Sequence, residues 1–162
     1  MSREEKHIAP VILGNLLTPG RILIRQGKQT KKEVLLALID AIAAEGEFGS
    51  RDELEWGIFH REGMMSTGIG NGIAIPHVLL PNIENNCMAL ALCPDGIADY
   101  QSCDQIPVRM VFMLAAGKSQ KVLHLKVLEA IGSLFYDGRL KAAFLAANDP
   151  KACLEILARA EN

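Results

Sequence analysis

Three residues of this sequence have side chains suited to phosphoryl chemistry: His77, Arg61 and His124. His77 ends a glycine-rich block that runs from Ser66 to His77 and reads STGIGNGIAIPH. An imidazole is a nucleophile near neutral pH and can hold a phosphoryl group covalently. Two interpretations of the block are open: it presents a reactive histidine, or it is a tight turn whose histidine merely caps a strand.

The block itself indicates how His77 would be presented. Its glycines alternate with other residues, so the backbone can adopt positive φ angles and approach a ligand or partner closely. Ile73 to Ile75 then has the pattern of a short buried strand, and Pro76 removes a hydrogen-bond donor where that strand would continue. We therefore expect His77 at a strand end, beside free N–H groups of the glycine turn.

Arg61 and His124 are the groups that a phosphoryl-carrying histidine would need nearby. Arg61 offers a planar, always charged fork of donors, at the edge of the glycine block. His124 shares one helical stripe with Leu128 and Ile131, because spacings of four and three residues fall on the same face. Each also has a structural interpretation, with Arg61 as a solvated residue at a helix end and His124 as a core histidine whose ring is satisfied.

Other chemistries fit the motifs less well. The block lacks the third glycine of G-x-G-x-x-G, and no Gly-Lys-Ser/Thr follows it, which argues against a dinucleotide or ATP site. His60, His77 and His124 lack the His-x-x-x-His spacing of a metal site, and we expect no metal. We interpret His60 and His7 as surface or packing residues. The four cysteines include no C-x-x-C pair, which is typical of reduced thiols.

Length and composition predict one globular domain. The chain has 162 residues, 49% of them hydrophobic and 22% charged, which is enough for a real core. We expect a single domain over residues 1–162, with 1–15 as an N-terminal helix or arm. The net charge is −2 and no long run of Lys or Arg occurs, so we expect no nucleic-acid partner. No segment has the character of a signal peptide or membrane span, so we expect a cytoplasmic protein without membrane insertion.

Caps and periodicity predict the first helices. A strand is expected at Arg21 to Ile24. Thr30 and Ser50 each open a capping box, and the helices that follow should end near Gly46 and Gly63.

The second half of the chain alternates in the same way between strand and helix signals. Apolar runs at 87–93 and 108–115 predict strands, and a helix is expected at 121–136, ended by Asp137-Gly138. A helix at 139–147 and a last one capped by Asp149 complete the order. This order predicts an α/β fold, a single domain in which a mixed β-sheet is flanked by helices on both faces.

The residues singled out above resemble a known family. Arg61-Glu62, the block from Ser66 to His77, and His124-Leu125 near a helix start are similar to the enzyme IIA domain of the fructose/mannitol type in the phosphoenolpyruvate-dependent sugar phosphotransferase system (PTS). That type includes the nitrogen-regulatory enzyme IIA. The block is the specific signature, and a weaker resemblance runs from about Leu16 to the last helix. The segments Pro94 to Ile106 and 117–120 depart from the family pattern, and we expect them to affect partner choice.

The resemblance implies a phosphotransferase that needs no metal or cofactor. His77 would accept a phosphoryl group from HPr or a nitrogen-branch HPr-like protein and pass it to an enzyme IIB component, or use its phosphorylation state to regulate a target protein. His124 and Arg61 would be the further catalytic residues. The glycine turn would supply phosphoryl-binding or partner-binding residues: Ser66, Thr67, Gly68, Gly70 and Asn71. The alternative is a non-catalytic signalling or binding module whose phosphorylation is only a switch.

Overall fold

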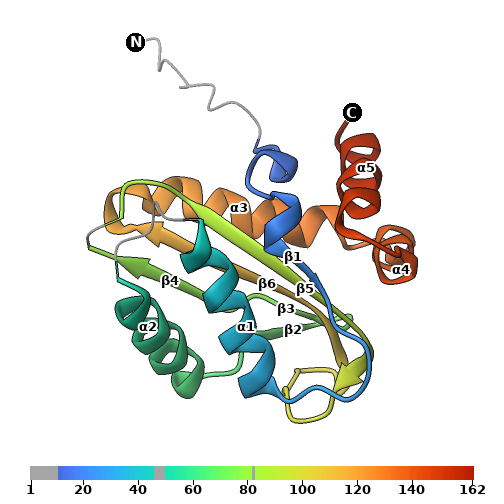
Figure 1. Ribbon diagram of the computed structural model, residues 1–162, viewed down its shortest axis with the longest axis horizontal. Coiled ribbons are helices and arrows are strands. Elements are labelled where there is room, and N and C mark those ends of the chain that lie inside the picture. The colour runs from blue at the N-terminus through green and yellow to red at the C-terminus, as the bar shows by residue number, and fades with distance from the viewer. Residues whose placement is uncertain (1–10, 46–49, 82) are drawn as a thin grey trace, which may run out of the picture.

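A six-stranded mixed β-sheet runs through the middle of the molecule, with helices on both of its faces (Figure 1). The computed structural model describes residues 11–45, 50–81 and 83–162. The strands are β1 (Ile22–Ile24), β2 (Gly68–Gly70), β3 (Ile73–Ala74), β4 (His77–Leu80), β5 (Cys87–Ile97) and β6 (Val108–Gly117). The helices are α1 (Lys31–Ala44), α2 (Arg51–Met64), α3 (Lys121–Leu134), α4 (Gly138–Ala146) and α5 (Pro150–Glu161), with short 3₁₀ turns at Leu13–Asn15, Pro19–Arg21 and Lys118–Gln120.

The two long strands, β5 and β6, form the antiparallel centre of the sheet. β1 pairs in parallel with the outer side of β5, and both β3 and β4 pair in parallel with the other side of β6. β2 folds back antiparallel onto β3. The expected α/β fold with a mixed sheet is therefore confirmed, and β4 is paired only with β6 among the described strands.

Alternate side chains of the central strands enter two separate cores. Ala89, Ala91, Val111 and Met113 pack with α1 and α2 on one face, whereas Leu90, Leu92, Met110 and Phe112 pack with α3, α4 and α5 on the other. Because both faces are covered, β5 is almost continuously apolar from Cys87 to Cys93. The apolar runs that predicted these strands do not alternate with polar residues. This is the pattern expected for strands of a sheet that is buried on both faces.

The capping signals place several helix starts correctly. The Thr30 side chain accepts from the Glu33 backbone N–H and Glu33 returns the bond, as a capping box requires, so α1 begins at Lys31. Ser50 accepts from the Glu53 backbone N–H at the start of α2, and Asp149 caps α5. These bonds satisfy backbone donors that the first helical turn leaves without partners.

Three boundary predictions differ from the structure or lie outside it. The predicted end of the first helix at Gly46 falls outside the described residues, as does most of the expected N-terminal arm; from Val11 onward the chain forms 3₁₀ turns instead of an α-helix. The helix expected to reach Tyr136 ends at Leu134. Asp137 does not end that helix but caps α4, because its side chain accepts from the Arg139 backbone N–H.

Candidate active site

His77 is the first residue of β4, at the outer side of the sheet. β3 and β4 lie end to end along the same side of β6, where Ala74 pairs with Val111 and His77 pairs with Leu114. Pro76 lies between the two strands: β3 ends before it, at Ala74, and His77 begins β4 after it, so the expectation that His77 lies at a strand end is confirmed. The Pro76 carbonyl still accepts from the Leu114 backbone N–H, so the chain continues in register.

The histidine ring is fixed by its own backbone. Its Nδ1 lies 2.7 Å from the carbonyl oxygen of Ile75. A carbonyl can only accept, so Nδ1 carries the hydrogen and the lone pair of the neutral ring is on Nε2. His77 is half-buried, and it lines a pocket at the sheet edge. The nitrogen available for chemistry is therefore Nε2.

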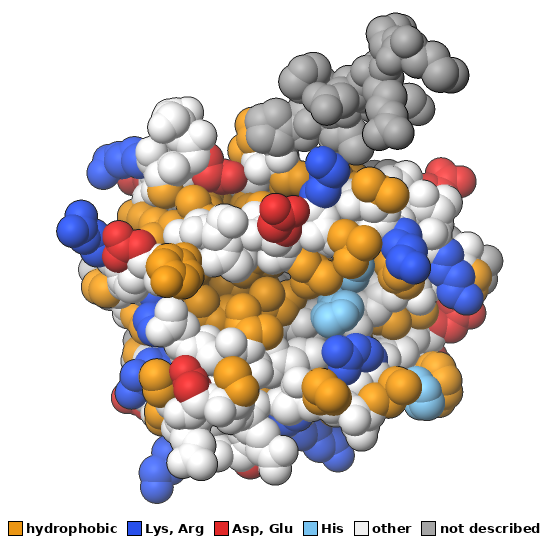
Figure 2. All heavy atoms as spheres, turned by 180° about the vertical axis from the view of Figure 1, so that it is seen from behind, with side chains coloured by type: hydrophobic (Ala, Val, Ile, Leu, Met, Phe, Trp, Pro, Cys, Tyr) orange, Lys and Arg blue, Asp and Glu red, His pale blue; other side chains and the backbone are white. Residues whose placement is uncertain are grey.

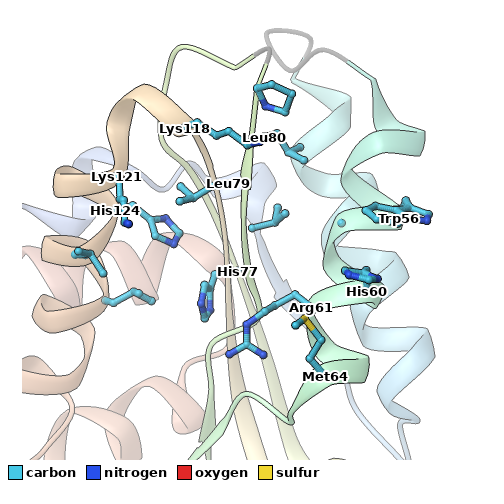
Figure 3. Close-up of a pocket in the computed structure, with 15 residues that line it drawn as sticks. Trp56, His60, Arg61, Met64, His77, Leu79, Leu80, Lys118, Lys121 and His124 are labelled. Carbon is cyan, nitrogen blue, oxygen red and sulfur yellow. The ribbon is translucent and has the colours of Figure 1, made fainter.

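Helix α2 reaches this histidine through a close contact with β4. A Cβ atom on Gly57 would lie 2.7 Å from the Val78 side chain, so the glycine lets the helix backbone approach the strand. Arg61 follows Gly57 by four residues and so lies one turn further along the same helix face. Its Nη1 donates to the carbonyl oxygen of Met65 at 3.0 Å, and Figure 3 shows the guanidinium beside His77.

Helix α3 approaches from the other helix layer and brings His124 to the same place. The two imidazole centroids are 5.4 Å apart, with the rings tilted by 50°. His124 is only 3% exposed, and neither of its ring nitrogens has a hydrogen-bond partner among the described residues. Burial, with a smaller contribution from the charge of His77, lowers the pKa of His124 to about 4. The second histidine is therefore a neutral donor that faces His77.

These residues surround a pocket of about 490 Å³ between α2, β4 and the start of α3. Its lining contains the cations Arg61, Lys118 and Lys121 and, among the described residues, no acidic side chain. The rest of the wall is largely apolar. In the space-filling view, histidine side chains lie among hydrophobic and basic ones (Figure 2). Such a pocket attracts an anion and excludes part of the water around it.

Part of the lining was not recognised from the sequence. His60, interpreted above as a surface or packing residue, lines the pocket and stacks on Trp56 with ring centroids 4.6 Å apart. Lys118 and Lys121 line it from the opposite side. Lys118 belongs to the segment 117–120, which departs from the family pattern just before the histidine helix, and Lys121 follows it directly. The spacing did not show which of these side chains line the pocket.

The glycine turn does not line the pocket, so the structure does not bring it together with His77, Arg61 and His124 there. Asn71 and Gly72 have φ angles of +59° and +75°, and they form the turn between β2 and β3. Asn-Gly with two positive φ angles is the preferred pair for a type I′ hairpin, a signal that the sequence already contained. The five residues expected to bind a phosphoryl group or partner are absent from the pocket lining: Ser66, Thr67, Gly68, Gly70 and Asn71.

The backbone N–H groups of the glycine turn donate hydrogen bonds to neighbouring residues of the protein. The Gly70 N–H donates to the Ser102 hydroxyl and the Asn71 N–H donates to the Asp104 carboxylate. The bond from Asn71, with a further one from the Ile106 N–H, holds the pKa of Asp104 below its usual range. The Thr67 N–H donates to Glu62 and the Gly68 N–H donates to the Ser66 hydroxyl. These four donors therefore already have partners, and none of those partners lines the pocket with His77.

Fold and site together define a class of protein: an α/β domain with a mixed sheet that presents His77, His124 and Arg61 in an anion-attracting pocket at the sheet edge. Residues 15–160 match the family model described as "Phosphoenolpyruvate-dependent sugar phosphotransferase system, EIIA 2". The chain therefore belongs to this family, and the resemblance seen in the sequence is confirmed. Membership gives it a phosphocarrier or regulatory role in the PTS.

Individual relatives cover both roles. The chain is 31% identical over 142 residues to the PTS system fructose-specific EIIABC component of Bacillus subtilis, covering 88% of this chain but only 22% of that one. It is also 31% identical over 151 residues to the Nitrogen regulatory protein of Pseudomonas aeruginosa, covering 93% and 97%. The chain thus spans about a fifth of the first relative and nearly all of the second.

Solved structures share the fold. The nitrogen regulatory protein IIA-Ntr from Neisseria meningitidis superposes with a TM-score of 0.80 at 22% identity, covering 91% of this chain and 99% of that one. IIA mannitol in complex with phosphorylated IIB mannitol, from Escherichia coli, gives a TM-score of 0.71 at 19% identity, covering 88% and 97%. Within the described residues, no helix has both the length and the apolar character needed to span a membrane.

Proposed function

We propose that this protein is a histidine phosphocarrier in which Nε2 of His77 accepts and releases a phosphoryl group. One observation carries the proposal: His77 Nδ1–H donates to the Ile75 carbonyl, which leaves the Nε2 lone pair in a pocket with Arg61 and with His124, whose ring nitrogens have no partner among the described residues. A neutral imidazole with a defined tautomer is the form that can attack phosphorus.

The transfer balances without a cofactor. The Nε2 lone pair forms a new bond to phosphorus while the bond between phosphorus and a nitrogen of the donor histidine breaks, and the electron pair of that bond returns to the donor ring. The Nδ1 proton of His77 stays on the ring throughout and remains hydrogen-bonded to the Ile75 carbonyl. Onward transfer reverses the roles, with a cysteine or histidine of the acceptor attacking the same phosphorus.

The pocket supplies charge for the transferred oxygens. Arg61 offers N–H donors beside His77, and Lys118 and Lys121 add positive charge from the α3 side. His124 is neutral and buried, so a hydrogen bond to a phosphoryl oxygen would satisfy one of its orphaned ring nitrogens. Donors that are already in place stabilise charge in the transition state without reorganisation.

The surroundings of the pocket suit a protein partner. Exposed apolar side chains flank it, with Trp56 and Met64 on α2 and Leu125 on α3 exposed by 68%, 72% and 54%. We propose that HPr or a nitrogen-branch relative docks here as donor, and that an enzyme IIB component or a regulated protein docks here in turn. The solved complex of IIA mannitol with phosphorylated IIB mannitol supports an enzyme IIB component as a partner for this fold.

The direct test is phosphoryl transfer from phosphoenolpyruvate through enzyme I and HPr, or through their nitrogen-branch relatives. We expect the wild type to gain one acid-labile, alkali-stable phosphoryl group by intact mass, and a folded His77→Ala variant to gain none. Labelling of His77→Ala at the wild-type level would place the reactive group elsewhere. A folded wild type that no donor pair labels would contradict the proposal.

A chase experiment separates the carrier from the switch. When the labelled protein is mixed with a panel of purified IIB proteins, loss of label to one of them identifies a transport carrier. Retention of the label together with phosphorylation-dependent binding of a target protein identifies the regulatory role, which the nitrogen regulatory relatives support.

A further inference from the structure

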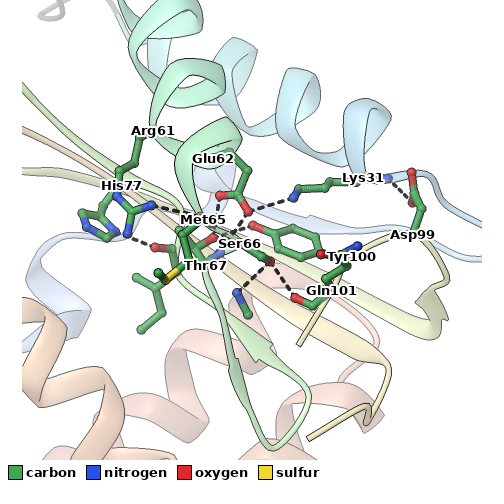
Figure 4. Close-up of polar contacts among 12 residues, drawn as sticks. Lys31, Arg61, Glu62, Met65, Ser66, Thr67, His77, Asp99, Tyr100 and Gln101 are labelled. Atoms are coloured by element: carbon green, nitrogen blue, oxygen red, sulfur yellow. Dashed lines mark hydrogen bonds and ion pairs between the residues drawn. The ribbon is translucent and has the colours of Figure 1, made fainter. Parts of the chain in front are cut away.

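A buried carboxylate lies directly behind the pocket. Glu62 follows Arg61 on α2, and Figure 4 shows the two side chains pointing to opposite sides, Arg61 toward His77 and Glu62 into the protein. The Glu62 side chain is only 4% exposed. Buried carboxylates are unusual unless they are paired, so its partners indicate why it is there.

Among the described residues, Glu62 pairs with Thr67, with Lys31 and with the Tyr100 side chain. Its carboxylate accepts from the Thr67 backbone N–H at 2.9 Å and from the Thr67 hydroxyl at 2.7 Å. Lys31 of α1 completes an ion pair at 2.8 Å. The Tyr100 hydroxyl contacts the Thr67 hydroxyl at 2.7 Å, and the Lys31 ammonium lies 4.4 Å from the centroid of the Tyr100 ring. The carboxylate therefore fixes Thr67 through both its backbone and its side chain.

Thr67 lies between the two carbonyl groups that hold the active side chains. Two residues before it, the Met65 carbonyl accepts from Arg61. On its other side, the Thr67 carbonyl accepts from the Ile75 backbone N–H at 3.0 Å, and the Ile75 carbonyl in turn accepts from His77 Nδ1. Hydrogen bonds, joined by the backbone of Thr67 and of Ile75, thus connect the Lys31–Glu62 ion pair to the imidazole of His77.

We propose that Glu62 is a positioning residue: by anchoring Thr67 it holds the Ile75 carbonyl that selects the Nδ1–H tautomer of His77 and the Met65 carbonyl that orients Arg61. This inference rests on the proposed function of His77 for its kinetic consequence, but its structural consequence can be measured in the unphosphorylated protein. Glu62 does not touch the pocket, because it is absent from the pocket lining.

The negative charge of Glu62 is essential to this arrangement. Glu62→Gln keeps the shape and one acceptor oxygen, but it removes the charge that pairs with Lys31 and puts an NH₂ group where the Thr67 donors need an acceptor. Thr67 then loses at least one of its two bonds, and the Ile75 peptide gains freedom. An active group displaced by even a fraction of an ångström transfers more slowly.

The primary measurement is the tautomer of His77, read from imidazole ¹⁵N chemical shifts at a pH where the ring is neutral. We expect the wild type to show the Nδ1–H form, and Glu62→Gln to show a mixture with the Nε2–H form. The rate of phosphorylation by the donor protein should fall about tenfold, in line with the effect of residues that orient an active group. Glu55→Gln is the matched control, since Glu55 is also on α2 and ion-paired, but to Arg51 near the surface. It should leave the tautomer and the rate unchanged.

The outcomes are distinct. A Glu62→Gln variant that keeps the wild-type tautomer overturns the proposal, whatever its rate. If that variant does not fold, Thr67→Val tests the same connection, because it removes the hydroxyl bond to Glu62 and keeps the backbone; an unchanged tautomer and rate would then overturn it. If the wild type itself is not phosphorylated, the tautomer shift still tests the positioning role, so failure of the proposed function is distinguished from failure of this inference.

Discussion

The imidazole of His124 faces that of His77 at 5.4 Å between centroids, and each ring comes from a different element, α3 and β4. One ring is bound through Nδ1 to a carbonyl, and the other has no partner on either nitrogen among the described residues. A buried polar group without a hydrogen-bond partner costs free energy. A phosphoryl group on His77 would lower this cost by giving the His124 ring a partner.

Phosphorylation of His77 is therefore expected to raise the pKa of His124. In the unphosphorylated protein that pKa is about 4, because the buried ring resists taking a charge. A phosphoryl group adds negative charge within reach of the ring, which favours the imidazolium. A ¹⁵N or ¹H titration of His124 before and after phosphorylation measures the change, and an unchanged or lower pKa would contradict the proposed contact.

His124 also predicts a pH dependence of stability. Its pKa is lowered from 6.5 to about 4 in the folded state, so between these values the unfolded chain binds more protons. The free energy of unfolding should fall by about 3 kcal/mol as the pH drops from above 6.5 to 4. Urea denaturation of wild type and His124→Gln across this range isolates the contribution, because the wild type should lose about 3 kcal/mol more than the variant as the pH falls to 4. Parallel curves would show that His124 does not cause the dependence.

Replacing Arg61 by lysine should slow phosphoryl transfer more than it weakens donor binding. Lysine keeps the charge but lacks the planar fork that can hold the Met65 carbonyl and a phosphoryl oxygen together. We expect the phosphorylation rate at saturating donor to fall about 10–100-fold. Arg51→Lys is a matched control on the same helix, because Arg51 pairs with Asp40 and Glu55 outside the pocket. Equal losses in both variants would argue against a role for Arg61 at the phosphorus.

Lys118 and Lys121 should control encounter with the partner. They line the pocket without a carboxylate partner among the described residues, so their charge is available to an approaching protein or phosphoryl group. The double variant Lys118→Gln, Lys121→Gln is expected to lower the rate constant for association with the donor and to flatten its dependence on salt. Stopped-flow kinetics at two ionic strengths measures both. Lys151→Gln, on α5 and away from the pocket, is the control and should leave both unchanged.

The contact between Gly57 and Val78 should determine how closely Arg61 approaches His77. A Cβ at position 57 would lie 2.7 Å from the valine side chain, and overpacking of this kind costs about 1–3 kcal/mol against the roughly 1 kcal/mol that alanine gains over glycine in a helix. Gly57→Ala should therefore destabilise the fold and slow phosphorylation by moving α2 outward. Adding Val78→Ala should restore much of both losses. A double variant no better than Gly57→Ala alone would show that this contact does not set the helix position.

Local patterns in the sequence determined the elements and their starts. The side chains of Thr30, Ser50 and Asp149 cap helices where the sequence predicted them, because a cap depends on residues within one turn. On the stripe that includes His124, the histidine and Ile131 are buried as their spacing indicated, and Leu128 is half-buried. The block that ends in His77 also identified the family, because a long run of specific residues can be matched to a family from the sequence alone.

The tertiary structure alone decided which groups surround the histidine. The glycine turn is adjacent to His77 in sequence, yet its N–H groups donate to Ser102 and Asp104 and to its own neighbours. Lys118 and Lys121 line the pocket instead, because α3 packs on the opposite side of the sheet edge from α2. The hydrogen bonds and ion pair behind the site likewise join Lys31, Glu62 and Tyr100 from three separate segments. Spacing along the chain reports contacts within a turn or a strand, whereas these contacts depend on how whole helices pack against the sheet.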